Sequence, residues 1–133
     1  LKDMNVKSAL EDAELPFHLA YDKDGNFIGA AVETFTNKGF SGNISLMVGI
    51  LADGTVNNIS VLQHAETPGL GSKMSEPSFK DQFNNKHADS FNFNVKKDGG
   101  DVDAITAATI SSRAFCDAVN RAISTFENNK GGF

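Results

Sequence analysis

Two Asp-Gly pairs constrain the fold of this chain more than any other feature. Asp24-Gly25 separates the segments "FHLAY" and "FIGAAVETF", and Asp53-Gly54 separates "ISLMVGIL" and "VNNISVLQH". Asp-Gly between apolar, β-branched runs is a strong hairpin signal, because glycine readily adopts the positive φ that tight hairpin turns require. With the loop "NKGFSGN" between the two hairpins, the sequence predicts four antiparallel strands in a meander that ends at residue 64.

The regular strand pattern stops at "AETPGLGSKMSEPSF", residues 65–79. Proline and glycine interrupt regular structure in this stretch, and a short helix is expected from Ser72 or Ser75. Further along, "FNFNV" alternates with period two and predicts one more strand at 91–95.

The last part of the chain predicts a long helix. Apolar residues recur at helical spacing from Phe115 to Phe126, which indicates one buried face of a helix over about 110–127. The final "NNKGGF" predicts a mobile tail at 128–133. A chain of 133 residues suffices for one core. We therefore expect a single α+β domain over 1–133, in which an antiparallel meander packs against helices.

Charge and composition exclude several kinds of partner and site. Twelve basic and seventeen acidic residues give a net charge of −5 without a basic cluster, which argues against a nucleic-acid partner. The single Cys116 excludes an internal disulfide and is expected in the core. His18, His64 and His87 are isolated and lack metal-ligand spacing, so neither a metal site nor a catalytic residue is predicted.

Four hydroxyl side chains crowd into "DAITAATISS", residues 103–112, just before the predicted helix. The first turn of a helix leaves backbone N–H groups without partners, and the hydroxyl of Thr106 or Thr109 can cap them. The same N–H groups and the helix dipole can instead bind an anion, with Ala107 and Ala108 small enough to admit a phosphate. The residues alone leave a helix cap and a phosphate site open. Neither a phosphate-loop nor a complete dinucleotide motif is present.

Two separate motifs together resemble a known family. "HAETPGLGSKM" at 64–74 and "DGGDVDAITAATISSRAFCDAV" at 98–119 are similar to the FMN-binding domain in the G subunit of Rnf-type electron-transport complexes. The related C subunit of the Na⁺-translocating NADH:quinone reductase looks similar as well. The resemblance covers about residues 26–126. It implies an electron-carrying flavoprotein domain that catalyses no net conversion by itself.

In such a domain FMN is attached through a phosphoester bond, and the resemblance assigns the acceptor hydroxyl to Thr109. A separate flavin transferase uses FAD as donor: the hydroxyl attacks the pyrophosphate, AMP leaves, and the remaining diester carries one negative charge. Ala107 stands where glycine is commoner. The predicted cofactor-binding residues are Glu66, Thr67, Pro68, Gly69, Leu70, Gly71, Asp103, Thr106, Ala107, Ala108, Thr109, Ile110 and Ser112. A protein made without active transferase would lack the covalent FMN.

The resemblance also implies partners and a location. The partners would be other membrane subunits of an Rnf-type complex and, during maturation, the flavin transferase. The domain would lie on the extracytoplasmic (periplasmic) side of the inner membrane, held by an N-terminal anchor that precedes this chain. The quinone-reductase C subunit is one alternative. A noncovalent phosphate- or nucleotide-binding module without a redox role is another, from a different class. For His64 and Glu66, surface or hydrogen-bonding roles are preferred over proton transfer to a flavin.

Overall fold

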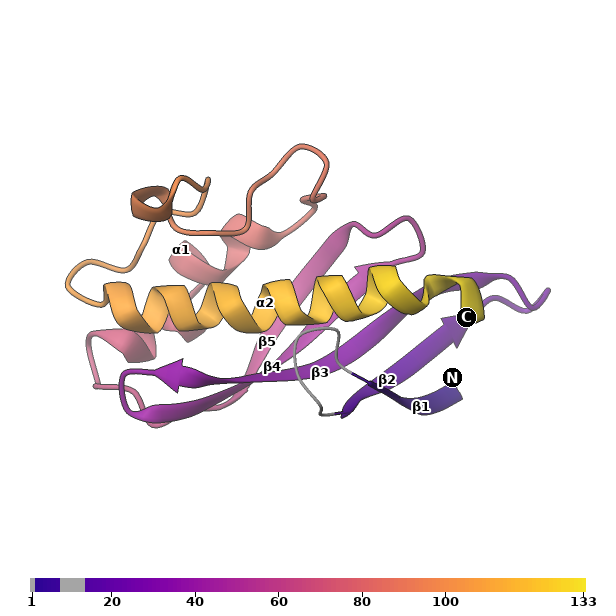
Figure 1. Cartoon of the computed structure of the whole chain (residues 1–133), viewed down its shortest axis with the longest axis horizontal. Helices are drawn as coiled ribbons and strands as arrows, with labels where there is room; N and C mark the ends of the chain where they lie inside the picture. Colours follow the sequence, from indigo (N-terminus) through magenta and orange to yellow (C-terminus); the bar gives the residue numbers. More distant parts are fainter. Residues whose placement is uncertain (1, 8–13) are drawn as a thin grey trace.

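Five antiparallel strands form one sheet in the order of the chain. In the computed structural model, which describes residues 2–7 and 14–133, the strands are β1 (Lys2–Lys7), β2 (Glu14–Tyr21), β3 (Phe27–Gly39), β4 (Gly42–Leu51) and β5 (Val56–Gln63) (Figure 1). The four predicted strands and the α+β fold class are confirmed. Strand β1, which pairs with β2, was not predicted.

Both Asp-Gly pairs form the predicted turns. Gly25 and Gly54 have φ angles of 84° and 95°, in the left-handed region that glycine tolerates. The pairing register then aligns buried side chains across the sheet: Phe17 opposes Val32, Val32 opposes Val48, and Val48 opposes Ile59. Because alternate residues of a strand point to the same face, this row gives the sheet one continuous apolar face.

Helix α2 (Thr109–Asn129) covers that face (Figure 1). Its buried side chains include Phe115, Val119 and Phe126, as the helical spacing predicted. A buried hydrogen bond fixes the helix on the sheet, since Thr34 Oγ1 on β3 donates to the Ala118 carbonyl over 2.9 Å. The helix prediction is confirmed, with bounds one and two residues wider than expected.

The tail continues helix α2 into a short 3₁₀ turn, η4 (Lys130–Gly132). The Phe133 ring packs against Phe17, Phe27 and Phe126, with ring centroids 5.4–5.6 Å away. The last residue therefore adds to the core in this structure, whereas the mobility of 128–133 stays a prediction.

Between β5 and α2 the chain forms short helical turns: η1 (Gly71–Ser75), α1 (Pro77–Lys80), η2 (Asp81–Phe83) and η3 (Lys96–Asp98). The short helix expected in this region is confirmed. The strand predicted at 91–95 is wrong. Phe93 and Val95 are buried as the alternation suggests, but Phe93 joins a cluster of phenylalanine rings that reaches Phe115 of α2. Only Val95 makes a β-bridge, to Val102.

Candidate functional site

A tight turn at residues 67–70 forms one side of the candidate site. The Leu70 N–H donates to the Thr67 carbonyl over 3.1 Å, and Gly69 has a φ of 75°. Pro68 before a left-handed glycine is the sequence signature of a type II turn. Ser72 accepts a hydrogen bond from the Gly69 N–H, so the turn is held against the start of η1.

A second turn of the same kind, at residues 105–108, forms the facing side. The Ala108 N–H donates to the Ile105 carbonyl over 3.0 Å, and Ala107 has a φ of 61°. An alanine in the left-handed region is strained by roughly 1–2 kcal/mol. Glycine is commoner at this position in the family that the sequence resembles. Ala107 therefore replaces a glycine at a position where the backbone is left-handed.

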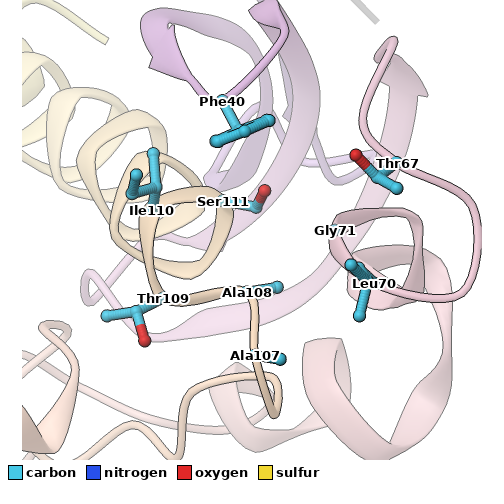
Figure 2. Close-up of a pocket in the computed structure, with 9 residues that line it drawn as sticks. All are labelled: Phe40, Thr67, Leu70, Gly71, Ala107, Ala108, Thr109, Ile110 and Ser111. Carbon is cyan, nitrogen blue, oxygen red and sulfur yellow. The ribbon is translucent and has the colours of Figure 1, made fainter.

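Between the two turns lies a cavity of about 360 Å³. Its volume is within the range of small-molecule sites. The lining residues come from the β3–β4 hairpin, the 67–70 turn and the start of α2: Phe40, Thr67, Leu70, Gly71, Ala107, Ala108, Thr109, Ile110 and Ser111 (Figure 2). Phe40 and Ser111 were not among the predicted residues. Phe40, Leu70 and Ile110 are exposed apolar side chains, which gives the cavity an apolar rim.

Thr109 is the first residue of α2 and half-buried. Its side chain points away from the wall formed by Thr67 and Leu70 (Figure 2). Ala108 is the N-cap residue and no side chain caps the helix, so the cap interpretation of Thr106 or Thr109 is wrong. Among the residues that the structure describes, the Thr109 hydroxyl has no hydrogen-bond partner. A nucleophilic hydroxyl is thus left available at the cavity.

The backbone at the start of α2 leaves N–H groups for an anion. The first intrahelical bond is donated by the Ser112 N–H to the Ala108 carbonyl, which leaves the N–H groups of Thr109, Ile110 and Ser111 without an intrahelical acceptor. The positive end of the helix dipole lies at the same place. A phosphate can therefore be held here without a basic side chain.

Ser112 holds the 105–108 turn together. Its fully buried Oγ accepts a hydrogen bond from the Ile105 N–H over 2.9 Å and donates to the Ala108 carbonyl over 2.8 Å. Both ends of the turn are thereby bonded to one side chain. Ser112 lies outside the cavity lining, so the structure places this predicted site residue in support of the turn.

Glu66 is buried beside the cavity and lies outside its lining. One carboxylate oxygen, Oε1, accepts hydrogen bonds from the Phe40 N–H over 2.8 Å and from the Ser111 hydroxyl over 2.6 Å. The other, Oε2, accepts one from the Ser41 N–H over 2.8 Å. Burial opposes ionisation, but the Ser111 hydroxyl, the two amides and nearby His64 together lower the pKa of Glu66 below its ordinary value. The carboxylate therefore stays charged near neutral pH.

Of the other predicted site residues, Pro68 and Gly69 shape the 67–70 turn and Asp103 and Thr106 lie away from the cavity. Asp103 pairs with Lys96 over 2.8 Å, and its backbone N–H and carbonyl both bond to the Gln82 amide group. Thr106 is exposed and lines a separate hollow with Asp103 and Gln82. Asp103 and Thr106 thus face this separate hollow and not the cavity.

His64 and Cys116, which the sequence analysis did not assign to catalysis or metal binding, make structural contacts. His64 Nδ1 accepts a hydrogen bond from the Glu66 N–H. Burial, followed by the charge of Asp98, raises the pKa of the Cys116 thiol to about 12, which makes it a poor nucleophile. Within residues 2–7 and 14–133 we find no group of three metal-ligating side chains and no helix long and apolar enough to cross a membrane.

A meander sheet crossed by one helix, with an apolar cavity at the first turn of that helix, fits a domain that binds a small molecule. Residues 39–124 match the family described as FMN-binding domain, and the chain belongs to this family. The resemblance inferred from the two motifs is confirmed.

The chain is similar to proteins named as the G subunit of an ion-translocating oxidoreductase complex. It is 40% identical over 124 residues to that of Shewanella baltica, with 90% of this chain and 58% of the relative covered. It is 39% identical over 129 residues to that of Methanosarcina acetivorans, with 93% and 66% covered. The chain therefore spans somewhat less than two thirds of these relatives.

Two solved structures share the fold. NqrC of Shewanella oneidensis has a TM-score of 0.66 at 22% identity, over 92% of this chain and 64% of that one. The C subunit of the Na(+)-translocating NADH-quinone reductase of Parabacteroides distasonis has a TM-score of 0.69 at 22% identity, over 88% and 63%. At this identity the likeness extends to the fold alone.

Proposed function

We propose that this chain is the flavin-carrying domain of an Rnf-type electron-transport protein, and that it holds FMN through a phosphoester bond to Thr109. The observation that carries the proposal is the position of this hydroxyl, at the start of α2 and at the lip of the cavity, without a partner among the described residues. The identity of about 40% with the G subunits of ion-translocating oxidoreductase complexes, over most of the chain, supports the same assignment and favours it over the quinone-reductase C subunit.

The residues around the cavity fit FMN. Phe40, Leu70 and Ile110 offer apolar surface to a planar ring. The N–H groups of Thr109, Ile110 and Ser111 have no intrahelical acceptor and would be available to a phosphate on Thr109. When bound, FMN supplies the electron transfer, while the protein contributes retention, orientation and shielding from water.

The cavity is open at its apolar rim, which suits a carrier. A flavin that relays electrons has to come close to a donor and an acceptor in neighbouring subunits. The proposed partners are other subunits of a membrane complex and, during maturation, the flavin transferase. The proposed location is the extracytoplasmic side of the membrane, with an anchor outside this chain. An independent turnover of substrate is not part of the proposal.

Intact-mass spectrometry of the chain co-expressed with its flavin transferase tests the proposal. The expected result is a mass increase equal to FMN minus water, lost in Thr109→Ala and kept in Thr109→Ser. Thr55→Ala is the matched control, because Thr55 lies between β4 and β5, outside the cavity lining, and should not affect the adduct.

An unmodified wild-type chain, with a transferase that modifies a control domain, would overturn the covalent attachment. Titration of the unmodified chain with FMN, followed by flavin fluorescence, then tests the alternative of a noncovalent module. Binding that survives Thr109→Ala would support that alternative.

A further inference from the structure

Phe40 is the most exposed large apolar side chain among the described residues, at 67%. Gly39 pairs with Gly42, so Phe40 and Ser41 are the two residues that connect β3 to β4. A phenylalanine at a hairpin tip adds little to the core and exposes apolar surface to water. Its ring lies across the cavity from Leu70 and Ala107 (Figure 2). This position suits a ring that covers a ligand.

The hairpin tip is held by a charged side chain from another segment. Glu66, 25 and 26 residues further along the chain, takes the N–H groups of both connecting residues, one on each carboxylate oxygen. The Ser111 hydroxyl donates to the same carboxylate from the first turn of α2. Hydrogen bonds to a charged acceptor are about twice as strong as those between neutral groups. The tip of the hairpin is therefore fixed relative to the helix that carries Thr109.

Gly71 packs closely against Glu66 and Ser111. A methyl group added to Gly71 would lie 2.8 Å from Glu66 Cβ and closer still to the Ser111 hydroxyl. Glu66 itself is 4% exposed and does not line the cavity. Glu66 is therefore not placed to contact a ligand directly. It can act on a ligand through the hairpin tip that it holds.

We propose that Phe40 is a contact of the isoalloxazine ring and that Glu66 is a positioning residue, which acts on the flavin by fixing the hairpin tip that carries Phe40. The inference rests on the proposed function, since it requires a flavin in this cavity. It assigns the two sides of the ring: Phe40 on one side, and Leu70 with the 105–108 turn on the other.

The test is made on the flavinylated chain with Phe40→Trp. An excited flavin accepts an electron from an indole in van der Waals contact, so its emission should fall severalfold. Leu62→Trp is the matched control: Leu62 is 49% exposed and lines a different hollow with Phe35, and an indole there should leave emission unchanged. Equal emission from Phe40→Trp and wild type would overturn the contact.

Glu66→Gln in the Phe40→Trp background tests the positioning role. Loss of the charge weakens the hold on the hairpin tip, so flavin emission should recover towards the wild-type value. Emission that stays quenched in a folded double variant would overturn the role of Glu66. If this variant does not fold, Ser111→Ala removes one of the three donors and should give a smaller recovery, and no recovery there would overturn it equally.

The collisional quencher iodide gives a second readout. Phe40→Leu should increase the iodide quenching constant of the bound flavin, because the ring is less covered. Intact mass is recorded for every sample. A wild-type chain without adduct contradicts the proposed function, whereas flavinylated variants with unchanged quenching contradict only the role of Phe40 and Glu66.

Discussion

The 67–70 and 105–108 turns face each other across the cavity, and their shared left-handed third residue is reached in different ways. Each closes with an N–H to carbonyl bond of about 3 Å and has a left-handed third residue. In the first turn, Pro68 and Gly69 favour that shape locally. In the second, Ala107 disfavours it and the buried Ser112 imposes it from outside the turn. The comparison teaches that the backbone of one turn is favoured by its own residues, whereas that of the other depends on a buried side chain outside the turn.

The largest expected effect comes from Ser112→Ala. It leaves the buried Ile105 N–H without an acceptor, which should lower the free energy of unfolding by about 2–3 kcal/mol. Ser72→Ala is the matched variant on the first turn, where the bond to Gly69 is exposed, and should cost less than about 1 kcal/mol. Urea unfolding measures both. Similar losses would remove the contrast between the two turns.

Next comes Glu66→Gln, because the bond between Glu66 and Ser111 joins the residue before the 67–70 turn to the first turn of α2. Replacing the carboxylate should cost about 2 kcal/mol at neutral pH. The folded-state pKa of Glu66 is lowered, so its stabilising contribution is present above its ordinary pKa and is lost as the pH falls through the folded-state value.

The difference in unfolding free energy between wild type and Glu66→Gln should therefore be constant near neutral pH and narrow below about pH 4.5. Denaturant titrations at several pH values measure it. Glu76→Gln is the control, because Glu76 is exposed and should leave the stability about unchanged. A difference that widens on acidification would contradict the assignment.

Gly69→Ala is expected to have a smaller effect. No atom lies within 4 Å of the added methyl group, so only the backbone strain at a φ of 75° remains. We expect a loss of about 1–2 kcal/mol, measured by thermal or urea unfolding. An unchanged stability would mean that the 67–70 turn tolerates the strain as the 105–108 turn does.

The smallest expected effect has the opposite sign. Ala107→Gly relieves strain at a φ of 61° but increases the freedom of the unfolded chain, so a net gain of about 0.5 kcal/mol is expected. Ala108→Gly is the control: its φ of −138° is not left-handed, and loss of its buried methyl group should destabilise the chain. If Ala107→Gly instead lowers the free energy of unfolding, the methyl group of Ala107 stabilises the chain by more than its backbone strain costs.

Features with local causes could be predicted from the sequence. The Asp-Gly turns and helix α2 are set by neighbouring residues and periodicity, and the structure confirms them. Strand β1 has no such turn signal next to it and depends on pairing with β2. The alternation at 91–95 correctly indicated burial, but tertiary packing of Phe93 replaced strand pairing.

The candidate site was predicted in part, for the same reason. Two motifs identified both walls, because each wall is a contiguous stretch of sequence. Phe40 was missed because it lies in a loop far from either motif, and only the bonds of Glu66 bring it to the cavity. Its one available signal was a large aromatic residue between two glycines, Gly39 and Gly42, at a hairpin tip.

Thr109 lies at the edge of the cavity, so a flavin attached to it would need only weak binding by the cavity itself. A ring tethered there by a short ribityl chain would be present at an effective concentration in the millimolar range. Even a weak, shallow apolar site would then be occupied most of the time. Under the proposed covalent attachment, the cavity can remain open on one side, and the ring remains available to neighbouring subunits without being lost to solution.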